Sequence, residues 1–289
     1  MPYLYLVSAL VMHATFSIFG RMYQDRTAHY KDVSPLFNFA QMISVTIVWG
    51  VFFALKFSFD AGVLLYSALF AVCYTSVNVG FIRALKLGTT MLSTLILNLA
   101  LVVTTTWGFL FWDAKPTAIV IVGLILVVVA LYLCLYQKKN VENKSFSWKW
   151  LFYALCALFG NSGCSIVQRT QQLKYNGQHG SMLMFFATLF SAIVCFFIYL
   201  KSDKCDTKMI LRRNWWLPVC SGIGNVGLNV FVMLLTFTTL SPSLIYPVLG
   251  VGALMVVTLV STLVFKERLK PLQWVGFLFG ATAIVLLSL

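Results

Sequence analysis

The most constraining feature of this chain is a series of long apolar runs separated by short polar gaps. Each run has about 20 mainly apolar residues, the length that an α-helix needs to cross a hydrocarbon core of about 30 Å. Because lipid offers no hydrogen-bond partner to the backbone, we expect the runs to be helices. We predict ten membrane spans, at residues 2–20, 35–55, 61–83, 88–112, 116–136, 148–168, 180–200, 215–238, 242–265 and 271–289.

The composition supports an all-α integral membrane protein. Hydrophobic residues make up 60% of the chain and charged residues only 10%. A soluble domain is usually about half apolar and about a quarter charged. The N-terminal run has no basic residue before it, so we expect a first span rather than a cleaved signal. The net charge of +13 comes from basic residues spread between the apolar runs, so we expect no nucleic-acid partner.

The sequence repeats itself across its two halves. Residues 13–24, HATFSIFGRMYQ, align with residues 161–172, NSGCSIVQRTQQ, after a shift of 148 positions. The shift pairs identical residues at Tyr5/Tyr153, Ala9/Ala157, Leu10/Leu158, Ser17/Ser165, Ile18/Ile166, Arg21/Arg169 and Gln24/Gln172. We therefore divide the chain into a first five-helix repeat (1–136), a charged linker (137–147) and a second five-helix repeat (148–289). An odd number of spans in each half inverts the second half, as in many secondary transporters.

The distribution of lysine and arginine predicts the orientation. The loops after odd-numbered spans carry 17 of these residues and the opposite side carries 4. Short cytoplasmic loops are enriched in Lys and Arg, so we expect both termini outside and the 137–147 linker in the cytoplasm. We expect the protein in a bacterial plasma (inner) membrane.

The C-terminal segment resembles a known transporter family. Residues 246–287 read YPVLGVGALMVVTLVSTLVFKERLKPLQWVGFLFGATAIVLL, with Pro247 within the ninth span, Glu267 in the loop that follows, and Gly276 and Gly280 in the tenth. With the 5+5 pattern, this segment resembles the drug/metabolite transporter superfamily, in particular its EamA-like branch. The resemblance implies a transporter without naming a substrate.

Polar residues near the middle of the spans are the candidate substrate site. An unpaired amide is costly in hydrocarbon, so each must face another helix or a wet cavity. His13 and Asn161 are 148 positions apart, and Asn78 and Asn229 are 151 apart, so both halves carry polar groups at related depths. The full candidate set is His13, Tyr74, Asn78, Asn98, Asn161, Asn225, Asn229 and Tyr246. Each asparagine alone is equally well explained as an interhelical hydrogen bond.

Charged residues at the span ends are candidates for gating or electrostatic attraction, namely Arg21, Arg83 and Arg169. Arg83 is also explained as an ordinary cytoplasmic anchor. His13 is open to two interpretations, a proton-coupling group or a structural histidine. The motif GIGNVG at residues 222–227 follows no strand, so we interpret its glycines as close-packing positions of the eighth helix.

These observations favour a secondary transporter that moves a small polar organic metabolite by alternating access. All eight acidic residues fall in loops or at span ends, which disfavours carboxylate-driven cation antiport. Amides, phenols and an imidazole suit a neutral or zwitterionic solute, amino-acid-like or vitamin-like. The alternative is efflux of lipophilic or cationic compounds through an aromatic-lined pocket; an intramembrane enzyme or a scaffold is more remote. We expect no cofactor, no metal, and a monomer or homodimer.

Overall fold

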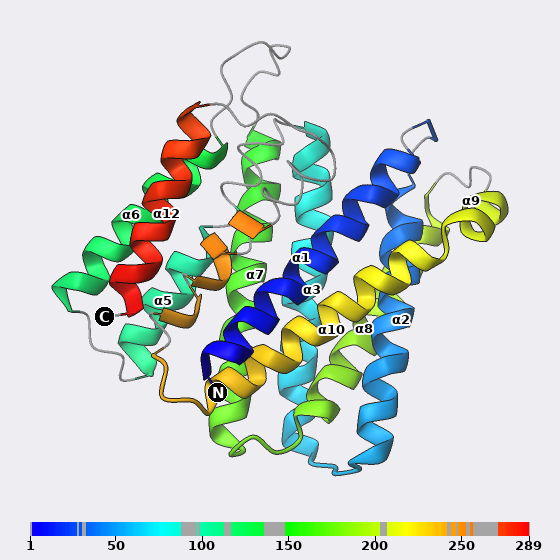
Figure 1. Cartoon of the computed structure of the whole chain (residues 1–289). Coiled ribbons are helices and arrows are strands. Elements are labelled where there is room, and N and C mark those ends of the chain that lie inside the picture. The colour runs from blue at the N-terminus through cyan, green and yellow to red at the C-terminus, as the bar shows by residue number, and fades with distance from the viewer. Residues whose placement is uncertain are drawn as a thin grey trace. The chain divides into compact units, whose positions relative to one another are not determined.

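The chain is almost entirely helical where the structure describes it (Figure 1). This computed structural model describes residues 2–27, 29–30, 33–87, 97, 99–112, 117–135, 148–202, 207–241, 244–246, 248–252, 255–256 and 271–288. Its helices are α1 (Pro2–Arg26), α2 (Ser34–Leu55), α3 (Ala61–Leu87), α5 (Ala100–Phe111), α6 (Ala118–Leu135), α7 (Trp148–Lys174), α8 (Gly180–Leu200), α9 (Thr207–Asn214), α10 (Trp216–Thr236) and α12 (Pro271–Ser288).

Six of the described helices are long and apolar enough to cross a membrane. They are Pro2–Gly20, Ser34–Leu55, Ala61–Phe81, Trp148–Lys174, Gly180–Leu200 and Trp216–Thr236. These helices confirm that the first, second, third, sixth, seventh and eighth predicted spans are helices of sufficient length and apolarity. Shorter apolar helices, Val102–Phe111, Ala118–Ala130 and Trp274–Ala283, lie within the fourth, fifth and tenth predicted spans. Most of the ninth, 242–265, lies outside the described residues.

Several helices differ from the sequence prediction. α1 continues to Arg26 and α3 to Leu87, beyond the predicted span ends at residues 20 and 83. The sixth span was expected to end at residue 168, but α7 continues to Lys174. At 1.5 Å per residue its 27 residues measure about 40 Å, more than the hydrocarbon core needs. The short helix α9, Thr207–Asn214, was not predicted, because its basic residues place it in the loop after the seventh predicted span.

The described chain divides into two compact units that differ from the two sequence halves. The first unit consists mainly of Tyr3–Thr75 and Val167–Phe237, and the second of Ser76–Ile166 and Thr238–Leu289. Each unit therefore combines segments from both halves of the sequence. The chain passes from one unit to the other within α3 and within α7.

The first unit is organised around α2 and α8, which pack against each other. Phe53 stacks on Phe185 with ring centroids 5.5 Å apart, and Phe39 stacks on Tyr199 at 5.8 Å. The residue numbers rise along α2 as they fall along α8, so the two helices are antiparallel. Met42 is fully buried between these two aromatic contacts and packs in a cluster with residues of α8.

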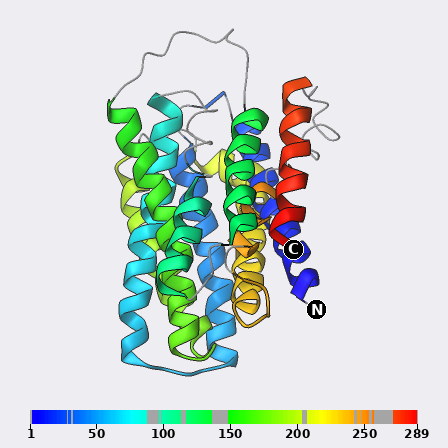
Figure 2. The ribbon, with the colours of Figure 1, turned by 90° about the vertical axis from the view of Figure 1, so that its left-hand side faces the viewer.

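The second unit is organised around α6 and α12, which run side by side in Figure 2. Its buried core cluster consists of Val127 on α6, Ala283 on α12, and Val251 from the segment between α10 and α12. Gly280 lets α12 approach Val251 closely, because a Cβ atom there would lie 2.9 Å from a methyl carbon of Val251. The same Cβ would make only an ordinary contact of 3.7 Å with Ala130 of α6.

Candidate functional site

The candidate site lies at the C-terminal end of α7. The N–H of Gly177 donates to the carbonyl of Gln172 at 2.8 Å, and the N–H of Asn176 donates to the carbonyl of Leu173 at 3.4 Å. This pair of bonds is the Schellman arrangement, which satisfies the last carbonyl groups of a helix. It requires a left-handed residue, and Asn176 has φ 48°. The last turns of α7 are therefore held as regular helix.

Those last turns carry four long polar side chains that are buried. Gln168 is 4% exposed, Arg169 8%, Gln171 0% and Gln172 2%. We call these four residues the α7 polar cluster. Long polar side chains are seldom buried unless they are hydrogen-bonded. Their burial therefore points to a built network rather than to a solvated helix end.

The α7 polar cluster is joined to α10 by hydrogen bonds. Gln168 Nε2 donates to the main-chain carbonyl of Asn229 at 3.3 Å. Asn229 Nδ2 in turn donates to the main-chain carbonyl of Asn225 at 2.9 Å and to Asn225 Oδ1 at 3.2 Å. Asn225 is 6% exposed. Two of the amides predicted from the sequence, Asn225 and Asn229, thus lie one turn apart on α10. The hydrogen bond from Gln168 connects them to α7.

The other end of the cluster reaches the connection between α7 and α8. Gln172 Nε2 donates to Gln171 Oε1, and Gln171 Nε2 donates to the carbonyl of Gln178 at 3.0 Å. Gly180, the first residue of α8, lies against the same amide, because a Cβ there would be 3.0 Å from Gln172 Nε2. The glutamine side chains consequently tie the α7–α8 connection to the helix end.

Arg169 gives this site its charge. Its guanidinium stays protonated in proteins and presents several donors in a planar fork. A buried charge requires compensating polar partners. A glutamine side chain has a carbonyl oxygen that can accept a hydrogen bond from a guanidinium. Together the amides and the guanidinium offer both donors and acceptors, a combination that suits a polar organic solute with a carboxylate.

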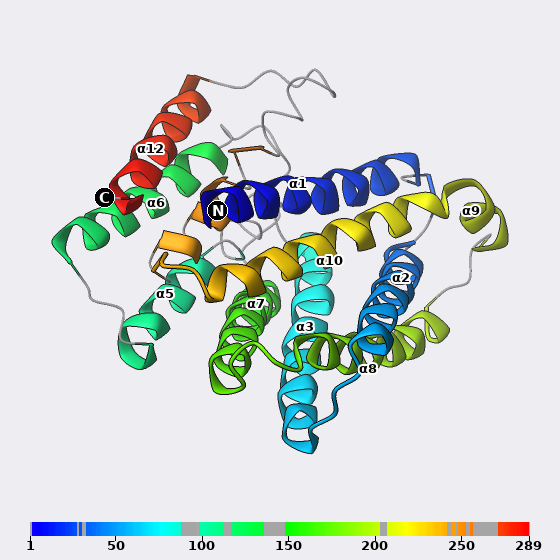
Figure 3. The ribbon, with the colours of Figure 1, turned by 60° about the horizontal axis from the view of Figure 1, so that its bottom comes forward.

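A second buried polar chain links α1, α2 and α10. Gln41 Nε2 donates to Ser221 Oγ at 3.2 Å, and Ser221 Oγ donates to the main-chain carbonyl of Phe16 at 2.9 Å. α1 and α10 run side by side in Figures 1 and 3. Their approach depends on Gly224, where a Cβ would lie 2.6 Å from the nitrogen of Phe16 and 2.9 Å from the carbonyl oxygen of Met12. The close-packing interpretation of the GIGNVG glycines is confirmed here.

The remaining predicted residues of the first unit lie in aromatic surroundings. His13 is half-buried on α1, with its ring centroid 6.2 Å from that of Phe16. Tyr74 stacks on Phe70 at 5.8 Å and packs against the core cluster of Met42.

The second unit holds four other predicted residues. Arg83 Nη1 donates to Tyr153 Oη at 3.1 Å and its guanidinium lies over that ring, at 5.3 Å from the centroid. Tyr246 is 6% exposed, and its ring centroid is 6.0 Å from that of Trp112. Asn78 is half-buried on α3, whereas Asn161 is exposed on α7.

Two predicted residues cannot be placed in the site. Asn98 lies outside the described residues, and so does the side chain of Arg21. The motif residues Pro247 and Glu267 also lie outside them. No group of His, Cys, Asp and Glu in the described part of the chain is arranged to hold a metal ion.

Several of the buried polar residues described above were not predicted as site residues. Gln168, Gln171 and Gln172 were assigned to the end of a span or to the loop beyond it, and Gln41 and Ser221 were not considered. A signal for one of them was present, because the repeat pairs Gln172 with Gln24. The length of α7, which brings these glutamines inside the helix, was the missing information.

The comparisons with known proteins support the fold and name no activity. No family model matches the chain. A protein of Haemophilus influenzae, described as an uncharacterized protein, is 23% identical over 182 residues, which are 61% of this chain and 59% of that protein. The matched part thus spans less than two thirds of the relative. A protein of known crystal structure has a TM-score of 0.74 at 12% identity, covering 99% of this chain and 95% of that one; the likeness shows a shared fold.

Proposed function

We propose that this protein is a secondary transporter that moves a small polar organic solute across the membrane by alternating access, in the manner of the drug/metabolite transporter superfamily. One observation carries the proposal. The α7 polar cluster and the amides of Asn225 and Asn229 are polar groups on two helices that are long and apolar enough to cross a membrane. Polar groups buried in membrane-crossing helices are costly and often mark solute pathways.

The packing of the helices supports the 5+5 inverted repeat. Under the predicted numbering, α2 and α8 are the second and seventh spans, and α6 and α12 are the fifth and tenth. Each of these helices therefore packs on its own equivalent from the other half of the sequence. A two-fold axis between inverted repeats would bring equivalent helices together in this way.

A second set of contacts follows the same symmetry. α1 packs with α10 in the first unit, and α7 packs with α3 in the second, where a Cβ on Gly80 would lie 2.9 Å from the carbonyl oxygen of Tyr153. These pairs are first with eighth and sixth with third, which are equivalent in a 5+5 repeat. In both pairs a serine hydroxyl donates to a partner's main-chain carbonyl, Ser221 to Phe16 and Ser76 to Cys156.

The charge of the site favours an amino-acid-like or vitamin-like solute over a cation. Arg169 brings a positive charge into a buried setting, where charges interact more strongly than in water. It would repel a cationic drug and attract a carboxylate, which a guanidinium binds through two parallel hydrogen bonds. The neighbouring amides would bind the remaining polar groups of a neutral or zwitterionic solute.

A ligand screen followed by one variant pair tests this proposal. The purified protein is heated with each member of a panel of amino acids, vitamins and cationic dyes, because a ligand of the folded state raises the melting temperature. We expect a shift with a carboxylate-bearing polar compound, and loss of that shift in Asn229→Leu but not in Asn161→Leu. Stabilisation by the cationic dyes alone would instead support the efflux function.

A further inference from the structure

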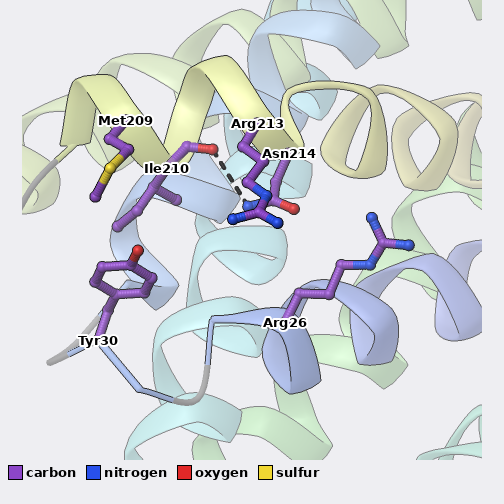
Figure 4. A pocket seen from close by; sticks show the side chains of 6 residues that line it. All are labelled: Arg26, Tyr30, Met209, Ile210, Arg213 and Asn214. Atoms are coloured by element: carbon purple, nitrogen blue, oxygen red, sulfur yellow. Dashed lines mark hydrogen bonds between the residues drawn. The ribbon is translucent and has the colours of Figure 1, made fainter.

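A separate cavity lies in the first unit, between the end of α1 and the short helix α9. It has a volume of about 400 Å³ and is lined by Arg26, Tyr30, Met209, Ile210, Arg213 and Asn214. Figure 4 shows the last four side chains coming from α9, and Arg26 and Tyr30 coming from the end of α1 and the turn that follows. The cavity is therefore formed between two segments that are far apart in the sequence.

Two guanidinium groups give this cavity a positive charge. Arg26 is held by the indole of Trp216, which lies 5.3 Å from its guanidinium carbon. Arg213 reaches the cavity from the last turn of α9. Two planar donor forks that line one hollow match the oxygen atoms of a phosphate, which arginine binds through paired hydrogen bonds.

The wall behind these arginines is buried and well packed. Ile210 is 1% exposed and belongs to a core cluster with Tyr23, Leu36 and Leu217. Asn214 is 6% exposed, and its Nδ2 donates to the carbonyl of Ile210 at 3.4 Å, as the dashed line in Figure 4 shows. The cavity is thus backed by the buried side chains of Ile210 and Asn214, while its two arginines remain accessible to solvent.

The surroundings of the cavity are those of a membrane surface. α9 ends where the membrane-crossing helix α10 begins, at Trp216. Three large apolar side chains around it are exposed, Met209 by 53%, Leu211 by 41% and Trp215 by 58%. A short helix that combines exposed apolar residues with arginines, next to an interfacial tryptophan, is typical of a segment that lies in the headgroup region.

We propose that this cavity binds the phosphate of an anionic phospholipid headgroup. Residues 201–213 carry five Lys and Arg against two Asp, and such a basic segment is attracted to the anionic cytoplasmic leaflet. A headgroup bearing one phosphate fits a cavity of this size. The lipid would hold α9 and the end of α1 together at the membrane surface. This site is independent of the proposed transport function.

Lipid titration of the purified protein tests the proposal. The melting temperature is followed in detergent as phosphatidylglycerol, phosphatidylcholine or inorganic phosphate is added to the wild type and to single variants. We expect stabilisation by phosphatidylglycerol that is about tenfold weaker in apparent affinity for Arg213→Gln and Arg26→Gln, since each removes one charge-assisted pair. The matched control is Arg212→Gln, which removes the same charge from the same helix but does not line the cavity.

Three results would overturn the proposal. Equal weakening in Arg212→Gln and Arg213→Gln would mean that diffuse surface charge, and not the cavity, attracts the lipid. Unchanged affinity in Arg213→Gln and Arg26→Gln would exclude the cavity. Stabilisation by inorganic phosphate equal to that by phosphatidylglycerol would assign the cavity to a soluble anion. All three variants change exposed arginines, so we expect their melting temperatures without lipid to match the wild type.

Discussion

The side-chain amide of Gln168 donates a hydrogen bond to the main-chain carbonyl of Asn229 at 3.3 Å. This bond fastens the last turns of α7 to the middle of α10, the sixth and eighth predicted spans. Asn229 at the same time holds Asn225 through its own side-chain amide. In the proposed carrier, a solute that takes over the hydrogen bond of Gln168 would loosen the contact between α7 and α10, which would couple binding to helix movement.

Replacing Gln168 with methionine should show whether its hydrogen bond to Asn229 is needed for solute binding or only for helix packing. Methionine has nearly the same volume and no hydrogen-bonding amide, so only the bond to Asn229 is lost. We expect a loss of about 1 kcal/mol in stability, the usual net value of one hydrogen bond, and a much larger fractional loss of solute binding. Melting temperature and ligand-induced shift measure the two effects. An unchanged ligand shift would show that Gln168 is structural only.

Gly224→Ala should separate α1 from α10. The added Cβ would meet the backbone of α1 at 2.6 Å from the Phe16 nitrogen, and a backbone cannot rotate away as a side chain can. We expect a destabilisation of about 1–3 kcal/mol, as for other overpacked contacts, seen as a lower melting temperature.

The matched control for that variant is Gly20→Ala. A Cβ on Gly20 would meet only Phe37 Cζ at 3.8 Å, an ordinary contact. Because alanine favours helix more than glycine does, by about 1 kcal/mol, we expect no loss of stability. Equal destabilisation of both variants would contradict the assigned contact between α1 and α10.

The stability of the first unit should fall at alkaline pH through Tyr23. Burial raises the pKa of Tyr23 to about 12 from its ordinary value of 10. The unfolded chain releases the phenol proton near pH 10 while the folded chain retains it to about pH 12, so stability declines as pH rises between these values. Tyr23 Oη has no hydrogen-bond partner in the described part of the chain.

Tyr23→Phe tests this effect directly. Removing an unpaired buried hydroxyl should leave the melting temperature at neutral pH unchanged or slightly higher. Between pH 10 and 12 the variant should lose less stability than the wild type. A parallel decline in both proteins would mean that other groups cause the alkaline effect.

The orientation predicted from charge is open to cysteine labelling in a cysteine-free background. Gln178→Cys, in the α7–α8 connection, should react with a membrane-impermeant maleimide on intact cells. Arg212→Cys, on α9, should react only after the cells are opened, since short basic loops face the cytoplasm. The reverse pattern would place both termini in the cytoplasm.

The sequence predicted the class of fold and the positions of six long helices because hydrophobic length is a local property. α2, Ser34–Leu55, and α8, Gly180–Leu200, nearly coincide with the predicted spans 35–55 and 180–200. The candidate set also included Asn225 and Asn229, chosen for their depth in the span, and the structure places them one turn apart on α10. The glycines of the GIGNVG motif were interpreted as packing positions because no strand precedes them, and their close contacts confirm this.

Features that depend on helix ends or tertiary contacts could not be predicted from the sequence. Gln171 and Gln172 are polar and follow an apolar run, so hydropathy alone ended the span before them. Only the left-handed Asn176 and the turn at Gly177 show that α7 continues past these glutamines. Likewise, the pairing of Gln41 with Ser221 joins residues 180 positions apart, and no local pattern reveals it.

Counterflow in proteoliposomes tests the central claim most directly. Vesicles containing the purified protein are loaded with the unlabelled compound that gave the largest ligand shift, and uptake of the labelled compound is followed in wild type, Arg169→Gln and Asn161→Leu. The transporter account predicts uptake above that of empty vesicles in the wild type and in Asn161→Leu, and a loss of at least about tenfold in Arg169→Gln, because a buried charge-assisted pair to the solute is removed. Uptake by the wild type no greater than that of empty vesicles, for every compound that binds, would contradict it.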